Sequence, residues 1–421
     1  MLDIKFIREN ADLVKDGAVK KNIAFDVAEL LRVDDERRAL LLDVEAMRGK
    51  QNETADAVPR ATDPKEREKL IIESKAIKEV LQGKEAELTE IMKTWHGLMV
   101  QVPNIPDVSV PEGKEDSDNV EVRTWGTIPK FDFTPKDHIE LMEKLDLVDF
   151  ERGTKMAGFR GYVLKNDGML LNFALWQFVL AKFVAKGFTP ILVPSLVKRE
   201  TMVGTGYLPQ GEDDLYKTQD GDFLAGTGEV GTMAYYMDEV LRKEDFPMKF
   251  IAFSPCFRRE AGSHSKDTKG LMRVHEFFKM EQVVLCEAVH EESVKYHEEL
   301  AALAEEVMQD LKIPYHVVVN CGGDLGLGQV KKYDIEAWVP SQNTYRETHS
   351  ISYFHDFQTR RLNIRYKDVD GKLRFAHSLN GTALPTPRPI IALIENYQNS
   401  DGSITIPEVL RPYMGGRYKI G

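Results

Sequence analysis

The feature that most constrains the fold is a pair of long helical patterns between residues 27 and 98. Residues 64–98 repeat apolar side chains at spacings of three, four and seven, which is the period of one helix face: Leu70, Ile77, Leu81, Leu88, Ile91, Trp95 and Leu98. Asp63 is suited to cap this helix and Pro64 to occupy its first turn. Residues 27–58 carry a stripe broken by charged residues, so neither helix would be stable alone. We expect an antiparallel two-helix coiled coil that turns within residues 58–64.

The role of this hairpin stays open on periodicity alone, because a dimerisation or spacer element fits the pattern as well as a binding arm does. The net charge of −12 argues against a nucleic-acid partner, since phosphate contacts need Lys and Arg. The acidity is nevertheless spread along the whole chain. A local basic stripe therefore remains compatible with the sequence.

The composition indicates a globular protein of two or three domains, with 421 residues of which 42% are apolar. Its three cysteines form no CxxC pair and are odd in number, so they support neither a disulfide framework nor a zinc knuckle, and a reducing compartment fits best. Residues 1–17 mix acidic and basic side chains, unlike a signal or transit peptide. No uninterrupted apolar run approaches the ~20 residues of a membrane span. We expect a cytoplasmic protein.

A proline-rich, charged segment at residues 101–126 predicts an ordered linker. We therefore expect an N-terminal domain (1–100), a linker (101–130) and a larger domain (131–421). The larger domain mixes expected helices at 169–185 and 287–311 with expected strands at 189–197, 222–226, 315–320 and 332–338, and with a strand–turn–helix at 373–397. Because regular helices do not separate the strands, the pattern favours an α+β fold: a mainly antiparallel sheet with helices around it.

Charged side chains interrupt two expected strands within residues 255–283. Side chains alternate across a strand, so these residues would face one cleft if a loop joined the strands: Arg258, Glu260, Arg273, Phe277 and Glu281. Arginine binds phosphate or carboxylate oxygens bidentately, and a phenylalanine ring can stack on a base. The set suits a ligand with phosphates, an ammonium group and a flat ring. A solvent-facing hairpin with cross-strand ion pairs fits the same pattern.

Three other segments carry candidate site residues. In "LAGTGEVG" (224–231), Thr227 and Glu229 could hold an ammonium group, although a plain glycine-rich turn is as good an interpretation. Glu347 and Ser350 offer hard oxygen ligands for Mg²⁺, and Arg388 precedes an apolar helix where it could meet an anion. "GGDLGLGQV" (322–330) lacks the third glycine and the strand–helix context of a dinucleotide-binding loop.

In their order along the chain, these motifs resemble the seryl-tRNA synthetase family of class II aminoacyl-tRNA synthetases. The first class II motif matches Gly187, Phe188 and Pro194. The second matches Phe257, Arg258, Glu260, Arg273, Val274, His275, Phe277 and Glu281, and the third matches Asn380, Gly381, Arg388 and Glu395. The helical hairpin occupies the place of the family's tRNA-binding arm. The chain departs from the usual family text at Gly226, Gly228 and Pro387.

The resemblance implies an antiparallel six-stranded sheet, a homodimer, and serine activation by ATP and Mg²⁺ followed by transfer to tRNA(Ser), with tRNA(Sec) left open as a second substrate. It implies that serine is bound by Thr227, Gly228, Glu229, Arg258, Glu281, Asn380 and Thr382. It implies that ATP is bound by Arg258, Arg259, Glu260, Arg273, Val274, Phe277, Glu347, Thr348, His349, Ser350 and Arg388. Arg258, Glu281 and Arg388 would be the catalytic residues, and Glu347 and Ser350 would hold the metal.

Two alternatives accompany this interpretation. An amino acid:carrier-protein ligase built on the same catalytic domain would lack the helical arm, which residues 27–98 supply. A non-catalytic coiled-coil binding protein would have lost Arg258, Glu281 or Arg388, and all three are present.

Overall fold

The computed structural model describes residues 1–262 and 267–421, which divide into two compact units. The smaller unit comprises residues 2–19 and 24–102. The larger comprises Met1, residues 20–23 and residues 103–421.

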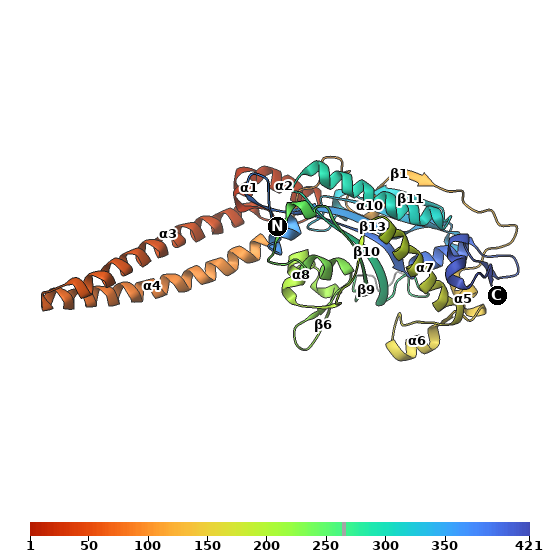
Figure 1. Ribbon diagram of the computed structural model, residues 1–421, viewed down its shortest axis with the longest axis horizontal. Coiled ribbons are helices and arrows are strands. Elements are labelled where there is room, and N and C mark those ends of the chain that lie inside the picture. The colour runs from red at the N-terminus through yellow and green to blue at the C-terminus, as the bar shows by residue number, and fades with distance from the viewer. Residues whose placement is uncertain (263–266) are drawn as a thin grey trace. The chain divides into compact units, whose positions relative to one another are not determined.

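The smaller unit is built around two long helices that lie side by side (Figure 1) and confirm the predicted hairpin. Its helices are α1 (Ile4–Glu9), α2 (Ala11–Lys20), α3 (Val27–Ala57) and α4 (Pro64–Met99). We call α3 and α4 the helical arm. Asp63 caps α4 as expected, its carboxylate accepting from the Lys65 amide at 3.1 Å, and Asp26 caps α3 in the same way. Local cap chemistry therefore sets where both helices begin.

A buried aspartate interrupts the apolar stripe of α3 near its start. Asp34 is 1% exposed and accepts from Arg8 Nη1 at 2.8 Å and from Arg37 Nη2 at 2.7 Å. The Arg37 guanidinium also lies 4.6 Å from the centroid of the Trp95 ring. This cluster ties α1, α3 and α4 together where the sequence pattern predicted only a weak seam.

The larger unit is organised by a sheet that, within the described residues, has eight strands rather than the six implied by the resemblance. All neighbours are antiparallel except β4 and β9. In spatial order the strands are β1 (Val120–Trp125), β11 (Tyr315–Val319), β12 (Lys331–Val339), β13 (Thr344–His355), β16 (His377–Thr386), β10 (Glu276–Cys286), β9 (Met248–Phe257) and β4 (Thr189–Leu192). The segment expected to be only a linker thus contributes the edge strand β1, which pairs with β11.

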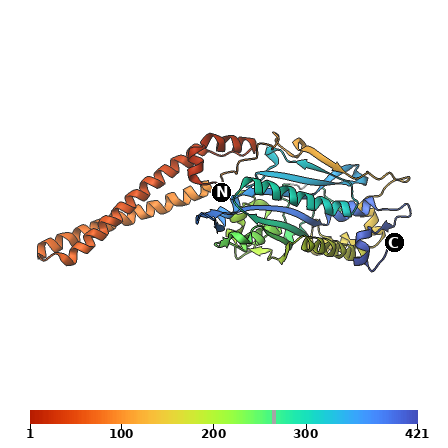
Figure 2. The same cartoon turned by 45° about the horizontal axis from the view of Figure 1, so that its top comes forward.

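Three helices pack on one face of this sheet and share a continuous apolar core with it: α7 (Asn166–Ala185), α10 (His290–Asp310) and α12 (Arg388–Asn396). Met280 and Val284 of β10 point into this core, and Figure 2 shows α10 lying along the strands. The alternate residues of β10 therefore face the opposite side. That side carries α9 (Gly228–Ala234), packed on β9 and β10.

The remaining elements are short and surround the sheet. The helices are α5 (His138–Lys144), α6 (Phe150–Ala157), α8 (Arg199–Thr205) and α11 (Phe357–Arg361). The strands are β2 (Val148–Asp149), β3 (Val163–Leu164), β5 (Leu196–Val197), β6 (Tyr216–Lys217), β7 (Phe223–Leu224), β8 (Val240–Arg242), β14 (Arg365–Lys367), β15 (Leu373–Phe375), β17 (Ile404–Thr405) and β18 (Lys419–Ile420). The single strand expected at 189–197 is two strands, β4 and β5.

Helix α7 is long and apolar enough, by length and composition alone, to cross a membrane. Of its most apolar window, 44% is buried within the described residues. A core helix of a globular domain meets the same test, and the packing of α7 against the sheet is of that kind.

Candidate active site

A polar cavity of about 290 Å³ lies on the sheet face opposite α7, α10 and α12. It gathers residues from β10, β12, β13, β16, α9 and the start of α12, which are far apart in the sequence. Among its lining are fourteen residues singled out from the sequence: Thr227, Glu229, Arg258, Glu260, Arg273, Val274, Phe277, Glu281, Glu347, Thr348, Ser350, Asn380, Thr382 and Arg388.

The residues Arg258, Glu260 and Arg273 reach the cavity from the connection between the strands, not from the strands themselves. Strand β9 ends at Phe257 and β10 begins at Glu276, so the predicted alternation does not apply to these three. The Arg258 amide donates to the His275 carbonyl at 2.9 Å, which keeps the two segments paired beyond the last strand residues of β9 and β10. Glu260 has a positive φ of 54° and pairs with Arg273. Residues 263–266 of the predicted loop lie outside the described residues.

The Arg258 guanidinium lies over the Phe277 ring, 5.3 Å from its centroid. Burial by itself lowers the pKa of Arg258, but the neighbouring Tyr207, Cys256, Glu260 and Glu347 outweigh burial and raise it. Arg258 is therefore a permanent cation inside the cavity, which is what an anionic ligand requires.

On β10 the predicted alternation is correct, and it places Phe277, Lys279 and Glu281 on the cavity face. Lys279 forms an ion pair with Glu281, and both side chains are buried. Burial raises the pKa of Glu281, and the adjacent ammonium of Lys279 opposes that shift. The sequence reasoning had passed over Lys279, although its parity with Glu281 was visible.

Glu229 is the second buried carboxylate of the cavity. It lies in the first turn of α9, where Thr227 is the cap and accepts from the Glu229 amide at 3.3 Å. Its carboxylate accepts from Tyr207 Oη at 2.8 Å and from Gln358 Nε2 at 2.6 Å. Burial raises the pKa of Glu229 against the effect of these hydrogen bonds. Tyr207 and Gln358 were missed because no local pattern links them to Glu229.

Arg388 and Glu347 form the outer part of the cavity. Arg388 Nη1 lies 3.3 Å from Glu347 Oε2, and Arg388 Nε donates to the Met272 carbonyl at 3.0 Å. Burial opposes ionisation of Glu347, but Arg388, Lys332 and Arg258 outweigh it and lower the pKa of this carboxyl. The neighbouring Asp334 behaves oppositely: its burial raises the pKa to about 6. Among the residues that the structure describes, no three His, Cys, Asp or Glu side chains converge on a metal site.

Two family models match this chain. Residues 1–106 match the seryl-tRNA synthetase N-terminal domain, and residues 216–397 match the class II tRNA synthetase core domain (G, H, P, S and T). The serine–tRNA ligase of Deinococcus radiodurans is 47% identical over 422 aligned residues, which cover 100% of this chain and 99% of that protein. The chain belongs to the seryl-tRNA synthetase family. It is accordingly a class II aminoacyl-tRNA synthetase and a serine–tRNA ligase.

Solved structures of seryl-tRNA synthetases agree with this membership. The enzyme from Pyrococcus horikoshii, crystallised with ATP, has a TM-score of 0.91 at 38% identity and covers 100% of this chain and 99% of its own. The cytoplasmic enzyme from Naegleria fowleri, in complex with AMP, has a TM-score of 0.87 at 32% identity and covers 100% of this chain and 98% of its own. The family fold expected from the motifs is thus confirmed over the whole chain.

Three residues assigned by the family resemblance do not line the cavity of this seryl-tRNA synthetase. Arg259 is exposed and its guanidinium donates to the Asp213 carbonyl at 3.0 Å. His349 is fully buried, with Nδ1 2.8 Å from Thr348 Oγ1, and burial lowers its pKa to about 4. Gly228 lies behind the lining, where an added Cβ would come 3.1 Å from Ser254 Oγ.

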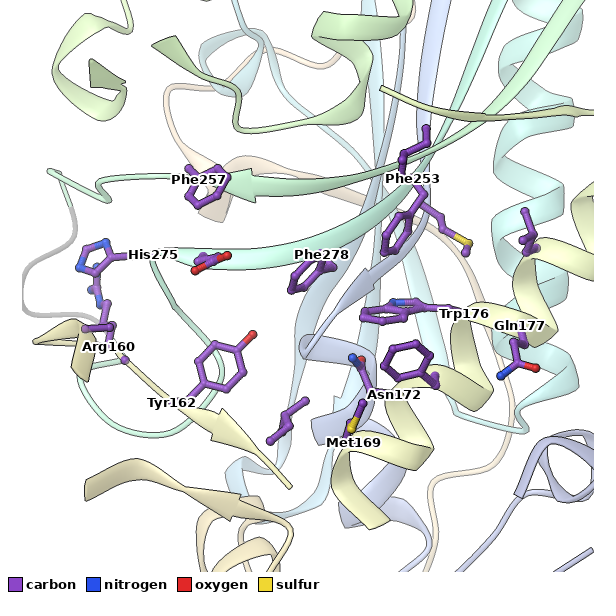
Figure 3. Close-up of a pocket in the computed structure, with 18 of the residues that line it drawn as sticks. Arg160, Tyr162, Met169, Asn172, Trp176, Gln177, Phe253, Phe257, His275 and Phe278 are labelled. Carbon is purple, nitrogen blue, oxygen red and sulfur yellow. The ribbon is translucent and has the colours of Figure 1, made fainter. Parts of the chain in front are cut away.

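A larger, apolar cavity of about 980 Å³ lies on the other side of β9 and β10, beside α7. Figure 3 shows the rings of Trp176, Phe253 and Phe278 gathered in this cavity, and the centroid of the Trp176 ring lies 5.1 and 5.4 Å from the centroids of the other two. Glu276, the first residue of β10, lines this second cavity and not the polar one. Strand β4 forms the adjoining end of the sheet.

Proposed function

We propose that this chain activates L-serine with ATP in the polar cavity and then transfers the serine to the 3′ end of tRNA(Ser). The observation that carries the proposal is the pairing of one permanent cation, Arg258, with two buried carboxylates, Glu229 and Glu281. A free amino acid has a carboxylate for the first and an ammonium group for the second. ATP adds phosphates, for which Arg273 and Arg388 stand nearby.

In the first step the serine carboxylate attacks the α-phosphorus and pyrophosphate leaves. Arg258 would hold the carboxylate and the α-phosphate together, and would stabilise the charge that develops on the phosphoryl oxygens. Phe277 and Arg388 would enclose the adenine ring, with Glu260 beside it. A ribose hydroxyl of the tRNA then attacks the seryl-adenylate, so no side chain needs to act as a covalent nucleophile.

Selection of serine would depend on its hydroxyl group. Glu281 is buried and its charge is supported by Lys279, so that it can accept a hydrogen bond from this hydroxyl near Thr382 and Asn380. Alanine would leave the buried carboxylate without that partner, and threonine would bring an extra methyl group.

Mg²⁺ would be held by Glu347 and Ser350. Both offer oxygen ligands toward the cavity, and the neighbouring cations keep Glu347 ionised, so the donors fit a hard divalent ion. Bound there, Mg²⁺ would neutralise phosphate charge during displacement.

We further propose that two copies associate through the apolar cavity beside α7. Large apolar side chains remain exposed there: Met169 and Phe173 on α7 and Leu192 on β4, with exposures of 47%, 43% and 74%. The backbone of β4 has a neighbour on one side only within the described sheet. An apolar patch next to an open strand edge is the kind of surface that a second copy covers.

We assign residues 1–100, with the helical arm, to tRNA binding, residues 131–421 to catalysis and residues 101–130 to the connection between them. We place the reaction in the cytoplasm. Neither alternative gains support. A carrier-protein ligase would lack the N-terminal domain that is present over residues 1–106, and a non-catalytic binding protein would have lost Arg258, Glu281 or Arg388.

The decisive experiment is ATP–pyrophosphate exchange with each of the twenty amino acids. We expect exchange with serine alone, and tRNA(Ser) charging with serine in the complete reaction. Exchange that needed no amino acid, or that preferred another one, would refute the proposed function.

A further inference from the structure

The glycine-rich segment 322–330 surrounds the ammonium group of a buried lysine. Lys21 is 2% exposed, and its ammonium donates to the carbonyl oxygens of Gly326 at 3.0 Å, Leu327 at 2.9 Å and Gln329 at 2.5 Å. Burial lowers the pKa of Lys21, while three carbonyl dipoles favour its charged form. Because a buried cation is costly, an apolar side chain would be the simpler way to fill this space.

The glycines of the segment permit this close packing. A Cβ on Gly322 would lie 2.1 Å from the Lys20 carbonyl oxygen, and one on Gly328 would lie 2.6 Å from the Phe357 ring. Any larger residue at either position would push the turn away from Lys21 or from α11.

The turn is held from two places that flank the helical arm in the sequence. Lys21 precedes α3, and Asn104 follows α4. Asn104 Nδ2 donates to the Gly328 carbonyl at 3.0 Å, and its backbone amide donates to the Leu327 carbonyl at 2.9 Å. The four successive carbonyls from 326 to 329 therefore all accept hydrogen bonds from these two residues.

The same turn also forms part of the wall of the polar cavity. Gln329 Oε1 accepts from the Gly326 amide at 2.6 Å, which closes the turn, and Gln329 Nε2 donates to Ser352 Oγ at 2.8 Å. Gln329 and Ser352 both line the cavity, and Ser352 stands opposite Asn380 in the register of β13 and β16. Asn380 belongs to the proposed serine pocket. The turn is thus connected to the serine end of the cavity through one side chain.

We propose that Lys21 is a positioning residue for the serine pocket, acting through the 326–329 turn and Gln329. Its ammonium organises the four carbonyls, the ordered turn fixes Gln329, and Gln329 holds Ser352 beside Asn380. The segment that precedes α3 and the segment that follows α4 thereby support the wall of the catalytic cavity. The inference rests on the proposed serine activation.

The test compares Lys21→Met, which keeps the length and removes the charge, with Lys20→Met in the full-length protein. Lys20 is the matched control because its ammonium lies 3.4 Å from the exposed carboxylate of Glu112, away from the carbonyls of the turn. In ATP–pyrophosphate exchange we expect Lys21→Met to raise the KM for serine about tenfold, with the KM for ATP and kcat within about twofold of the parent. Lys20→Met should leave all three unchanged. A lower kcat with both KM values unchanged would mean a smaller folded fraction and would overturn the inference.

Two further measurements separate positioning from stability. Lys21→Ala removes the side chain beyond Cβ, and n-propylammonium chloride supplies the missing atoms; we expect it to lower the KM for serine again, whereas sodium chloride at equal concentration should not. The substitution Gln329→Ala leaves Lys21 in place and should raise the KM for serine. Adding Lys21→Met to this variant should raise that KM little further. Absence of rescue, or a normal KM for serine in Gln329→Ala, would overturn the inference. If the parent protein shows no serine-dependent exchange, the proposed function itself fails.

Discussion

The helical arm and the catalytic sheet both carry charged residues where an apolar seam or core would run. In the arm these charges remain in contact with solvent, whereas in the sheet they are buried. In the arm, Arg48 pairs with Glu85 at 2.6 Å and Lys84 with Asp43 at 2.7 Å, and at least one member of each pair is largely exposed. In the sheet, Lys279 and Glu281 are almost completely buried. Burial raises the pKa of Glu281, whereas the Arg32 side chain lowers the pKa of the exposed Glu29 in the arm. Burial, more than residue type, therefore distinguishes a site from a solvated surface.

A deletion of residues 30–95 is the experiment that most clearly separates the functions of the arm and of the sheet. We expect the shortened protein to retain serine-dependent ATP–pyrophosphate exchange, because no residue of the polar cavity lies in the removed segment. Charging of tRNA(Ser) should fall to background, because the proposed RNA-binding arm is gone. Both activities can be measured on one preparation. Normal charging by the shortened protein would contradict the arm assignment.

The substitution Arg258→Ala removes the central cation of the polar cavity and so tests whether this cavity is the active site. We expect the kcat for exchange to fall by about 10²–10³, the loss typical of removing one electrostatic partner of a transition state. Arg242→Ala is the matched control, because Arg242 is an exposed arginine that pairs with Asp245, three residues along the chain, at 2.6 Å. If Arg258→Ala lost no more activity than this control, the cavity would not be the active site.

The contribution of carboxylates to folding stability should change with pH in opposite directions in the polar cavity and in the helical arm. Burial raises the pKa of Glu229 and of Glu281, so both take up protons at a higher pH than exposed carboxylates do. We expect kcat/KM for serine to fall in this window, above the ordinary value of ~4.3. The folded protein then binds more protons at these groups than the unfolded one, so their contribution to folding stability rises as activity is lost.

A pH profile of exchange, combined with urea unfolding at each pH, checks both directions. Glu281→Gln should remove part of the acid limb at a cost in the KM for serine. The arm variant Glu29→Gln should leave the profile unchanged. An acid limb at the pH of ordinary exposed carboxylates would show that neither buried group controls activity.

The sequence predicted the regular parts of both regions and missed contacts between distant segments. Helix ends at residues 57 and 64 follow from local caps and a turn, and the alternation of Phe277, Lys279 and Glu281 follows from a regular strand. Arg258 and Glu260 broke the same rule because β9 had already ended. Tyr207 and Gln358 could not be found at all, since they meet Glu229 from 22 and 129 residues away. Strand β1 was hidden by the prolines that precede it.

Asp34 is a charged residue of the arm that is buried, as Lys279 and Glu281 are in the sheet. Asp34→Asn removes a buried carboxylate between Arg8 and Arg37, and we expect the smaller unit to lose about 2 kcal/mol, less than for a fully buried pair because both arginines are partly exposed. Urea unfolding followed by helical circular dichroism measures the change. Asp35→Asn, at an exposed neighbour that also pairs with Arg8, is the control and should cost much less. Equal losses in the two variants would make burial irrelevant to the arm.

The smallest effect should come from the pair that links the two arm helices in solvent. Arg48 and Glu85 retain 59% and 36% of their side-chain exposure, so each is hydrated before and after pairing. We expect a coupling energy of about 0.5 kcal/mol from Arg48→Ala, Glu85→Ala and the double variant, because water screens the attraction and holding two long side chains costs entropy. Raising the salt concentration to ~1 M should remove most of it. A coupling well above about 1 kcal/mol that persisted in salt would place this pair with Asp34 and Glu281, and the contrast between a solvated arm and a buried charged site would no longer hold.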